Sequence, residues 1–316
     1  MVEPPRARAA TARPPAVAPG ADPEWQTAGW DSPGQGDQQE QGDQQGRGGG
    51  GKGAPAEAGQ AFSARVRACF SGAAPQYDRG ARIQRSIAWR LGHLCRSLEL
   101  VGGPRADLGA GTGLLARSIA LQRPGLQLLR LDNCQALLDQ DPQGAESACQ
   151  PLLWDLNLGL PAQLQGASLL ASSFALQWLE QPQLQLERWA SHLAPGGWLV
   201  LAVPCALSFQ QWRLAAERAG VPYTGLALPQ ADGLIAAAQG RLQLQRCQRL
   251  HFSRWHPGAL PFLRQLKAIG AQASPGGQLG RAALRRLQAH WPGNGAEQPL
   301  EWEVLLLIAR KPGATP

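Results

Sequence analysis

A strand that runs into a glycine-rich turn and then into an amphipathic helix constrains this chain most. It spans residues 106–120, ADLGAGTGLLARSIA, and its glycines Gly109, Gly111 and Gly113 alternate across the turn. Backbone can approach a ligand closely only where side chains are absent, and glycine also reaches dihedral angles closed to other residues. The turn alone is a weak signal, because an ordinary tight strand-to-helix connection has the same pattern.

Strand and helix signals alternate beyond this turn. Five strands are expected first, over 104–110, 126–132, 149–157, 167–176 and 194–204. The helices between them are expected over 113–123, 133–140 and 181–193. Such alternation favours right-handed crossovers and a parallel sheet.

The rhythm changes after Pro204. Two further strands are expected over 242–252 and 300–311, and the late helices over 208–220, 228–240, 261–270 and 280–290. Ahead of the first strand, residues 61–98 indicate two helices broken around 72–77. The sequence therefore predicts an α/β fold with a seven-stranded, mostly parallel sheet, helices on both faces and helical insertions that form a lid.

Three aspartates follow the ends of three successive strands. Asp107 stands two residues before the first glycine, Asp132 follows Gly113 by 19 residues, and Asp155 comes after the third strand with Leu156 beside it. A carboxylate in the place of Asp132 can accept both hydroxyls of a ribose, and Asp155 is placed to reach an adenine edge. Together with the glycine turn, these residues predict a nucleoside site at the switch point of the sheet. Dinucleotide sites place the third glycine one residue later.

The first 60 residues differ in composition from the rest. They hold 12 Gly, 8 Pro and 8 Gln, with 5 basic and 8 acidic residues. Such a segment cannot bury enough apolar surface to offset the entropy of ordering it, so 1–60 is predicted to be a disordered tail and 61–316 the folded domain. The domain carries 25 basic and 15 acidic residues, a net charge of +10, which favours an acidic partner.

Composition also excludes several classes. No apolar run approaches the roughly 20 residues of a membrane helix, and the first 20 residues lack the apolar core of a secretory signal. The six cysteines are scattered with no Cys or His cluster at metal-ligand spacing, so we expect free thiols and no metal. Few aromatic residues are interleaved with the basic stretches, whereas nucleic-acid binding favours such interleaving. A cytoplasmic protein that contacts neither membrane nor nucleic acid is expected.

The segments DLGAGTG and LAPGGWLVL resemble motifs of the class I methyltransferases, which have a Rossmann-like fold and use S-adenosylmethionine. The resemblance implies that Asp107 approaches the ammonium of the cofactor, Asp132 its ribose and Asp155 its adenine amino group. It also implies that the glycines of the turn and Leu156 line the same site. The lack of phosphate-binding features agrees, because this cofactor has no phosphate.

Four further segments narrow the resemblance to the malonyl-acyl carrier protein O-methyltransferases of biotin synthesis. They are CFSGAAPQYDRGARIQ, SSFALQWLEQP, FLRQLKAIGAQASPGGQLGRAALRRL and EWEVLLLIARK, and the resemblance covers about residues 62–312. Two departures are Ala110, where a cysteine is common, and Asn133–Cys134 after Asp132. The family transfers a methyl group to the free carboxylate of malonyl-acyl carrier protein. An acidic carrier would suit the basic late helices.

The resemblance implies that Tyr77, Ser173, Gln177 and Trp178 line the substrate site. Each also has a purely structural interpretation: Trp178 as a core aromatic, Gln177 as a surface residue, and Tyr77 as packing at a helix junction. The segment LKAIGA could likewise be only a helix end with Gly270 as its cap. The arginine that holds the substrate is not identified by the sequence.

Two other functions fit the same motifs. One is a methyltransferase for small carboxylic acids of the trans-aconitate type, which shares the ALQW element and needs no basic docking face. The other is a non-catalytic protein that keeps the fold and binds the cofactor. The preference for carrier protein over coenzyme A stays open, and we expect a monomer.

Overall fold

The computed structural model describes residues 54–142, 150–256, 258–275, 277–292 and 298–313. Residues 1–53, which form most of the predicted tail, lie outside the described residues. Helix α1, Ala54–Ala73, begins inside the range assigned to that tail. The five cysteines within the described residues are free thiols, and Cys149 lies outside them.

Seven strands form one sheet in the order β3-β2-β1-β4-β5-β7-β6. Their bounds are Arg105–Leu108 (β1), Leu129–Asp132 (β2), Leu152–Leu153 (β3), Ala167–Ser173 (β4), Leu193–Pro204 (β5), Gln243–His256 (β6) and Gln298–Arg310 (β7). Strands β1 to β5 pair in parallel, whereas β7 is antiparallel to both of its neighbours. The predicted sheet is confirmed. Chain order reverses between β1 and β4, which places the switch point at the glycine turn.

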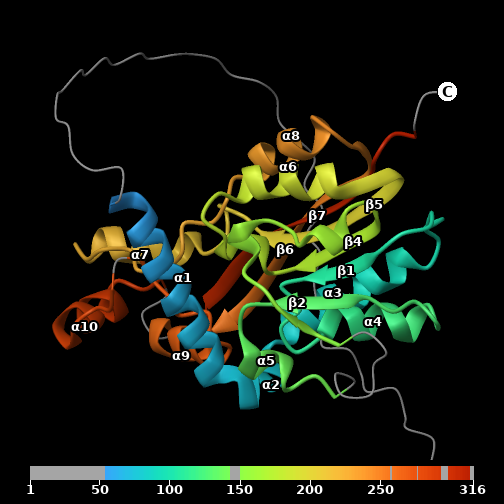
Figure 1. The fold of residues 1–316 in the computed structure, drawn as a ribbon. Helices are drawn as coiled ribbons and strands as arrows, with labels where there is room; N and C mark the ends of the chain where they lie inside the picture. Colours follow the sequence, from blue (N-terminus) through green and yellow to red (C-terminus); the bar gives the residue numbers. More distant parts are fainter. Residues whose placement is uncertain (1–53, 143–149, 257, 276, 293–297, 314–316) are drawn as a thin grey trace, which may run out of the picture.

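Helices cover both faces of the sheet, as predicted (Figure 1). One face carries α3, Arg82–Cys95, and α4, Leu114–Gln122, whose Leu91 and Ile119 are fully buried in the core below the sheet. The other carries α6, Pro182–His192, and α8, Ala231–Gln239, whose Trp189 and Leu234 are equally buried.

The late insertions form a helical layer with a core of its own. It consists of α7, Gln210–Arg218, α9, Ala259–Ala268, and α10, Arg281–Ala289. Their core is centred on Trp212, Phe262 and Leu287. Figure 1 shows this layer beyond one end of the sheet, beside α1. The predicted helical insertions are thus confirmed.

None of the described helices is long and apolar enough to cross a membrane.

Short elements complete the chain and shape the ends of the strands. They are the α-helical turns Tyr77–Gly80 (α2) and Gln135–Leu138 (α5) and the 3₁₀ turns Ala74–Gln76 (η1), Leu156–Leu158 (η2), Ala162–Leu164 (η3) and Leu176–Trp178 (η4). The break predicted around 72–77 is therefore the passage from α1 through η1 into α2.

Gly270 ends α9 and lets it approach α1. Its φ of 73° is left-handed. The amide of Ala271 donates to the carbonyl of Leu266 (2.9 Å) and the amide of Gly270 to that of Lys267 (3.1 Å), which is a Schellman cap. A Cβ at Gly270 would lie 2.8 Å from the Cα of Phe70. The predicted capping role is confirmed, and the close contact with α1 is a second reason for glycine here.

Candidate functional site

A cavity opens where β1, β2 and β4 end. The residues predicted for the cofactor meet here, since Asp107, Gly109, Gly111, Asp132, Asp155 and Leu156 all line it. Gly113 is not among the lining residues. Helix α1 closes the cavity with Ser63, Val66 and Phe70.

The three glycines of the turn serve different needs. All have positive φ angles, 71° at Gly109, 55° at Gly111 and 80° at Gly113, which side chains disfavour. A Cβ at Gly109 would lie 2.2 Å from the Cβ of Ala175, and one at Gly113 would lie 2.5 Å from Oδ2 of Asp141. At Gly111 the nearest atom would be 3.8 Å away. Close packing therefore leaves no room for a side chain at Gly109 or Gly113. Gly111 has free space around its Cα and lines the cavity.

Asp132 is held by the backbone on two sides. The amide of Gly111 donates to its Oδ2 and the amide of Cys134 to its Oδ1, both at 2.8 Å. Burial raises the pKa of Asp132 to about 6, although these amide hydrogen bonds oppose the rise. The carboxylate is therefore preorganised between the glycine turn and the start of α5.

Asp107 is only 1% exposed beneath the turn. Its Oδ2 accepts a hydrogen bond from the amide of Ala116 (3.0 Å) in the first turn of α4. Burial raises the pKa of Asp107 to about 7, with a further contribution from Asp132 and against the Ala116 hydrogen bond. A buried carboxyl group that lines a cavity is best stabilised as an anion by a cationic ligand group.

Asp155 caps the turn that follows β3. Its Oδ1 accepts from the amide of Asn157 (2.9 Å), which fixes η2 and places the buried Leu156 against the cavity. The acid and the leucine thus line the cavity together.

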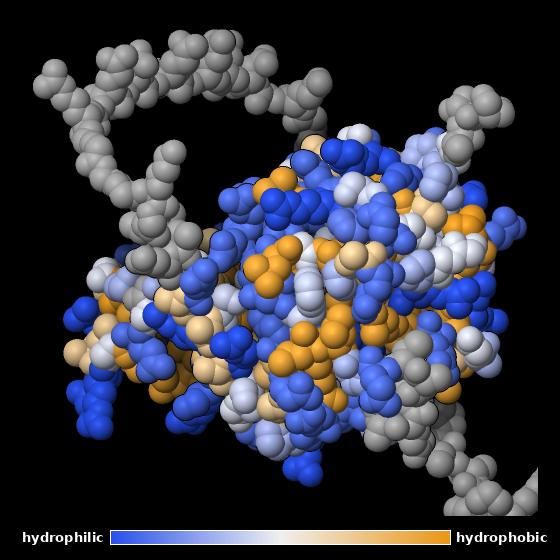
Figure 2. All heavy atoms as spheres, viewed as in Figure 1, coloured by the Kyte–Doolittle hydropathy of each residue, from blue (hydrophilic) through white to orange (hydrophobic). Residues whose placement is uncertain are grey.

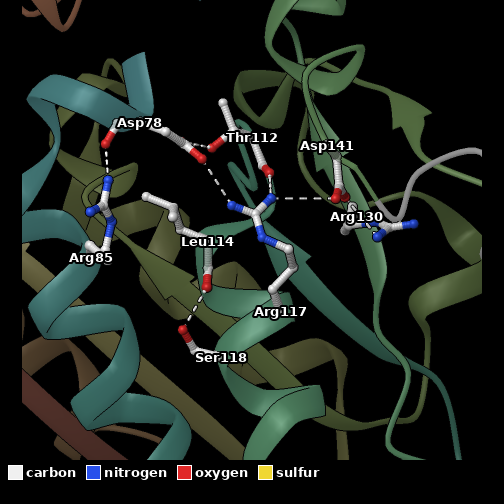
Figure 3. A network of polar contacts seen from close by, with 8 residues as sticks. All are labelled: Asp78, Arg85, Thr112, Leu114, Arg117, Ser118, Arg130 and Asp141. Carbon is white, nitrogen blue, oxygen red and sulfur yellow. Dashed lines mark hydrogen bonds and ion pairs between the residues drawn. The ribbon is translucent and has the colours of Figure 1, made fainter. Parts of the chain in front are cut away.

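A polar network ties the glycine turn to α2 (Figure 3). The hydroxyl of Thr112 donates to Asp78 (2.6 Å), and Arg117 pairs with Asp78 at 3.0 Å and with Asp141 at 3.4 Å. Arg130 pairs with Asp141 at 2.7 Å. The sequence alone did not indicate this network. Arg117 in α4 and Arg130 in β2 each stand within an apolar run, and a charge that is buried needs a partner. These two arginines could therefore have indicated an ion-pair network.

A second cavity adjoins the first. It has a volume of about 320 Å³, near the lower end of the roughly 300–1,000 Å³ of small-molecule sites. Its walls come from α7, α9, α10 and the segment 224–228. Five residues line both cavities, so the two meet there: Phe70, Tyr77, Gln84, Phe174 and Trp178.

The four predicted substrate residues gather around this junction. Tyr77 and Trp178 line both cavities, Ser173 lines the first and Gln177 the second. Burial and the carboxylates of Asp132 and Asp78 raise the pKa of Tyr77, so its phenol stays protonated. The amide nitrogen of Gln177 donates to the Phe174 carbonyl (2.7 Å). Its Oε1 and the hydroxyl of Ser173 are buried without a partner in the described part of the chain.

Phe70, Gln84 and Phe174 are site residues that the sequence analysis missed. Phe70 meets Trp178 edge-on, with ring centroids 5.3 Å apart. Phe174 has a φ of 57°, a left-handed conformation that is uncommon for a bulky residue and often found at functional sites. Phe70 and Tyr77 come together across the turn between α1 and α2, with ring centroids 6.3 Å apart.

The chain has relatives among known proteins. No family model matches the chain. A protein of Alcanivorax borkumensis named malonyl-acyl carrier protein O-methyltransferase is 31% identical over 250 residues, which is 77% of this chain and 84% of that protein. The chain belongs to this methyltransferase family. A relative of the same name from Serratia marcescens is 28% identical over 76% of this chain and 92% of its own length.

Solved structures support the fold. The YcgJ protein of Bacillus subtilis matches with a TM-score of 0.50 at 14% identity, over 71% of this chain and 98% of its own. A candidate methyltransferase of Bacillus halodurans C-125 also scores 0.50, at 16% identity over 70% of this chain and 98% of its own. The class I methyltransferase fold is therefore shown, and the protein is a methyltransferase whose cofactor is S-adenosylmethionine.

The first cavity suits this cofactor. Three carboxylates line it, and no lysine, arginine or histidine does so among the described residues. A sulfonium and an ammonium are cations, and a ribose diol is a donor, so each finds an acceptor there.

Proposed function

We propose that this protein methylates the free carboxylate of a malonyl group carried on acyl carrier protein, an early step of pimeloyl and biotin synthesis. The observation that carries the proposal is the meeting of two unlike cavities at Tyr77 and Trp178. One is acidic and suits a cationic methyl donor, and the other is largely apolar and suits a chain-like acceptor. The names of the relatives supply the identity of that acceptor.

Cofactor contacts are assigned to the residues that line the first cavity. Asp107 would hold the ammonium, Asp132 the ribose hydroxyls and Asp155 the adenine amino group, with Leu156 against the base. When bound there, S-adenosylmethionine would supply the methyl group of its sulfonium to a carboxylate oxygen, with the electron pair of the broken carbon–sulfur bond left on sulfur.

No general base is needed on this protein. A carboxylate has a pKa near 4 and is ionised at neutral pH, so the chain's residues position and desolvate it. Tyr77 keeps its proton and can donate one hydrogen bond, as can the unpartnered hydroxyl of Ser173. Gln177 offers a buried acceptor oxygen that has no partner among the described residues, while one of its N–H groups donates to the Phe174 carbonyl. It therefore suits an amide of the substrate arm better than the carboxylate. Trp178 and Phe70 form the apolar wall.

The test is a product analysis by mass spectrometry. The full chain is incubated with S-adenosylmethionine and, separately, malonyl-acyl carrier protein, malonyl-coenzyme A and trans-aconitate. A methyl ester on the malonyl thioesters is expected. Esterification of trans-aconitate alone would favour the small-acid alternative, and cofactor binding without any product would favour the non-catalytic one.

The carrier, rather than coenzyme A, is proposed as the bearer of the malonyl group. Arg281 and Arg285 line a surface groove on α10 together with Leu260 and Leu284, and these leucines also line the second cavity. Cations beside the cavity suit the acidic surface of a carrier. Figure 2 shows hydrophilic side chains on the outer edge around α10 and apolar ones set back between them. We further propose a cytoplasmic monomer, which light scattering and cell fractionation can check.

A further inference from the structure

We propose that Arg264 and Lys267, in the wall of the second cavity, are the anion subsite that holds the malonyl carboxylate before methyl transfer. The inference rests on the proposed function and adds the residues that select a charged acyl group over a neutral one.

Charge is segregated between the two cavities. The described residues that line the cofactor cavity include Asp107, Asp132 and Asp155 and no cation. Those that line the second cavity include Arg264 and Lys267 and no aspartate, glutamate or histidine. An anion therefore finds cationic side chains only in the second cavity among the described lining residues, so a carboxylate is expected to reach the junction from that side.

The rest of that wall cannot neutralise a carboxylate. It is mainly aromatic and aliphatic, with Phe209, Leu263 and Leu266 among its residues. Moving a carboxylate into such surroundings without a partner is costly, and neutral donors compensate only part of the cost. Gln177 is a neutral amide, with one N–H donating to the Phe174 carbonyl and an acceptor oxygen without a partner among the described residues. The two cations are the groups of this wall that match the substrate's charge.

Helix geometry brings both cations close to the junction. Arg264 and Lys267 are three residues apart on α9, so they project from the same side. A Cβ at Gly80 of α2 would lie 2.6 Å from Cγ2 of Ile269, so the end of α9 abuts the helix that begins with Tyr77. At 1.5 Å per residue, Lys267 and Arg264 are about 3 and 7.5 Å back from Ile269 along the axis, within reach of long side chains.

Both cations are available for a ligand. Neither takes part in the ion pairs found among the described residues, and both are exposed at the cavity edge. They can meet the anion at the entrance and keep one of its oxygens while the other faces the methyl donor. The ester formed is neutral and no longer pairs with them, so the same two residues would favour release of the product.

The experiment compares an anion with its neutral counterpart. Malonyl-pantetheine, which has no phosphate, and its methyl ester are titrated by calorimetry into the full chain saturated with S-adenosylhomocysteine. The wild type should bind the acid about 10- to 100-fold more tightly than the ester, the range for hydrogen bonds to a charged group. Arg264→Gln/Lys267→Gln should remove this preference and lower kcat/KM for malonyl-pantetheine by a similar factor. Cofactor affinity and Tm should stay unchanged.

Two control variants sharpen the result. Arg264→Lys keeps the charge and should keep most of the preference. Arg241→Gln, at an exposed position after α8 and outside both cavities, should behave as the wild type.

Several outcomes would overturn the inference. One is equal binding of acid and ester by the wild type. Another is a double variant that loses activity on malonyl-coenzyme A but not on malonyl-pantetheine, which would assign the cations to a phosphate. Absence of methylation of every malonyl thioester by the wild type would instead refute the proposed function, and a wild-type preference for the acid would still be measurable.

Discussion

Burial raises the pKa of two aspartates of the cofactor cavity, and a cationic ligand would stabilise their ionised form. Burial raises the pKa of Asp107 to about 7 and that of Asp132 to about 6. Both carboxyl groups accept hydrogen bonds from backbone amides, which keep them oriented. Their burial removes water from the charged form, which costs free energy. Such residues reduce the stability of the free protein and increase its affinity for the ligand.

The first prediction is a pH dependence set by Asp107. The unfolded chain releases this proton near its ordinary pKa of 3.8, whereas the folded protein holds it to about 7. The contribution of Asp107 to stability is therefore full below pH 4 and is lost as pH rises to about 7. Asp107→Asn should melt higher than the wild type at pH 8 and equally at pH 4 when no cofactor is present. It should bind S-adenosylmethionine more weakly at pH 8. A lower Tm at pH 8 would contradict this account.

The second prediction concerns Asp132. Asp132→Ala removes the acceptor assigned to the ribose hydroxyls, so calorimetry should show cofactor binding weakened by about 1.5–3 kcal/mol, the range for a hydrogen bond to a charged group. Asp139→Ala is the matched control, because Asp139 lies in the turn after α5 and does not line the cavity. Equal affinities of Asp132→Ala and the wild type would remove the ribose assignment.

The three aspartates at strand ends were predictable from the sequence, whereas Gln84 and Phe174 were not. Asp107, Asp132 and Asp155 meet because parallel strands deliver their carboxyl ends to one edge, a rule that sequence order alone can use. Gln84 and Phe174 reach the junction through the packing of α3 and an uncommon backbone angle, which no spacing rule encodes.

At the scale of elements, α1 and α9 depend on one close contact. Gly270 ends α9 with a left-handed φ and leaves room for the backbone of Phe70, a residue that lines both cavities. The structure therefore couples the capping of one helix to the placement of another over the site.

The third prediction tests this contact. Gly270→Ala adds backbone strain of about 1–2 kcal/mol and a clash 2.8 Å from the Cα of Phe70. It should lower both Tm and kcat/KM. Gly220→Ala is the control, because Gly220 ends α7 with a φ of 58° and the same hydrogen-bond pattern, yet a Cβ there meets nothing within 4 Å. That variant should lose stability from strain alone and keep its activity. Similar activity losses in both variants would show that the Phe70 contact is unimportant.

Elements were predicted well where their periodicity is strong. The glycine turn, α6 and β5 lie where the sequence places them, since long apolar patterns decide them. The expected strand over 149–157 shortens to Leu152–Leu153, because Asp155 caps a 3₁₀ turn directly after it. The hydrogen bond that Asp155 accepts from the turn thus ended the strand earlier than the apolar residues predicted.

At the scale of the whole molecule, α1 follows the low-complexity segment in the sequence and is the first helix of the methyltransferase domain. Ser63, Val66 and Phe70 of this helix line the cofactor cavity, so the catalytic unit includes α1 and is proposed not to require the residues before it.

The fourth prediction concerns those residues. Removal of 1–53 should leave Tm, cofactor affinity and turnover unchanged, because their composition offers little apolar surface to bury. Removal of 1–75 is the comparison and should abolish cofactor binding, since it deletes the α1 residues that line the cavity. A large loss on removing 1–53 would mean that this segment packs on the domain.

The fifth prediction concerns the carrier protein and follows from the distribution of charge over the molecule. Arg281 and Arg285 are four residues apart on α10, both exposed, beside leucines shared with the second cavity. If this surface docks an acidic carrier, Arg281→Glu/Arg285→Glu should raise the KM for malonyl-acyl carrier protein at least about 10-fold, because like charges then face each other. Malonyl-pantetheine, which lacks the carrier, should hardly be affected, and cofactor affinity should be unchanged.

Salt and a charge-matched variant separate docking from damage. Rising salt should weaken the wild-type reaction with the carrier more than that of the variant, because screening acts on attraction between exposed charges. Arg188→Glu/Arg241→Glu makes the same change in net charge at exposed positions of α6 and beyond α8, away from both cavities, and should leave the KM near that of the wild type. Equal losses on carrier and malonyl-pantetheine would indicate a damaged site. No loss on either would move docking to another face, around Arg213 and Arg218 of α7, where the same pair of measurements applies.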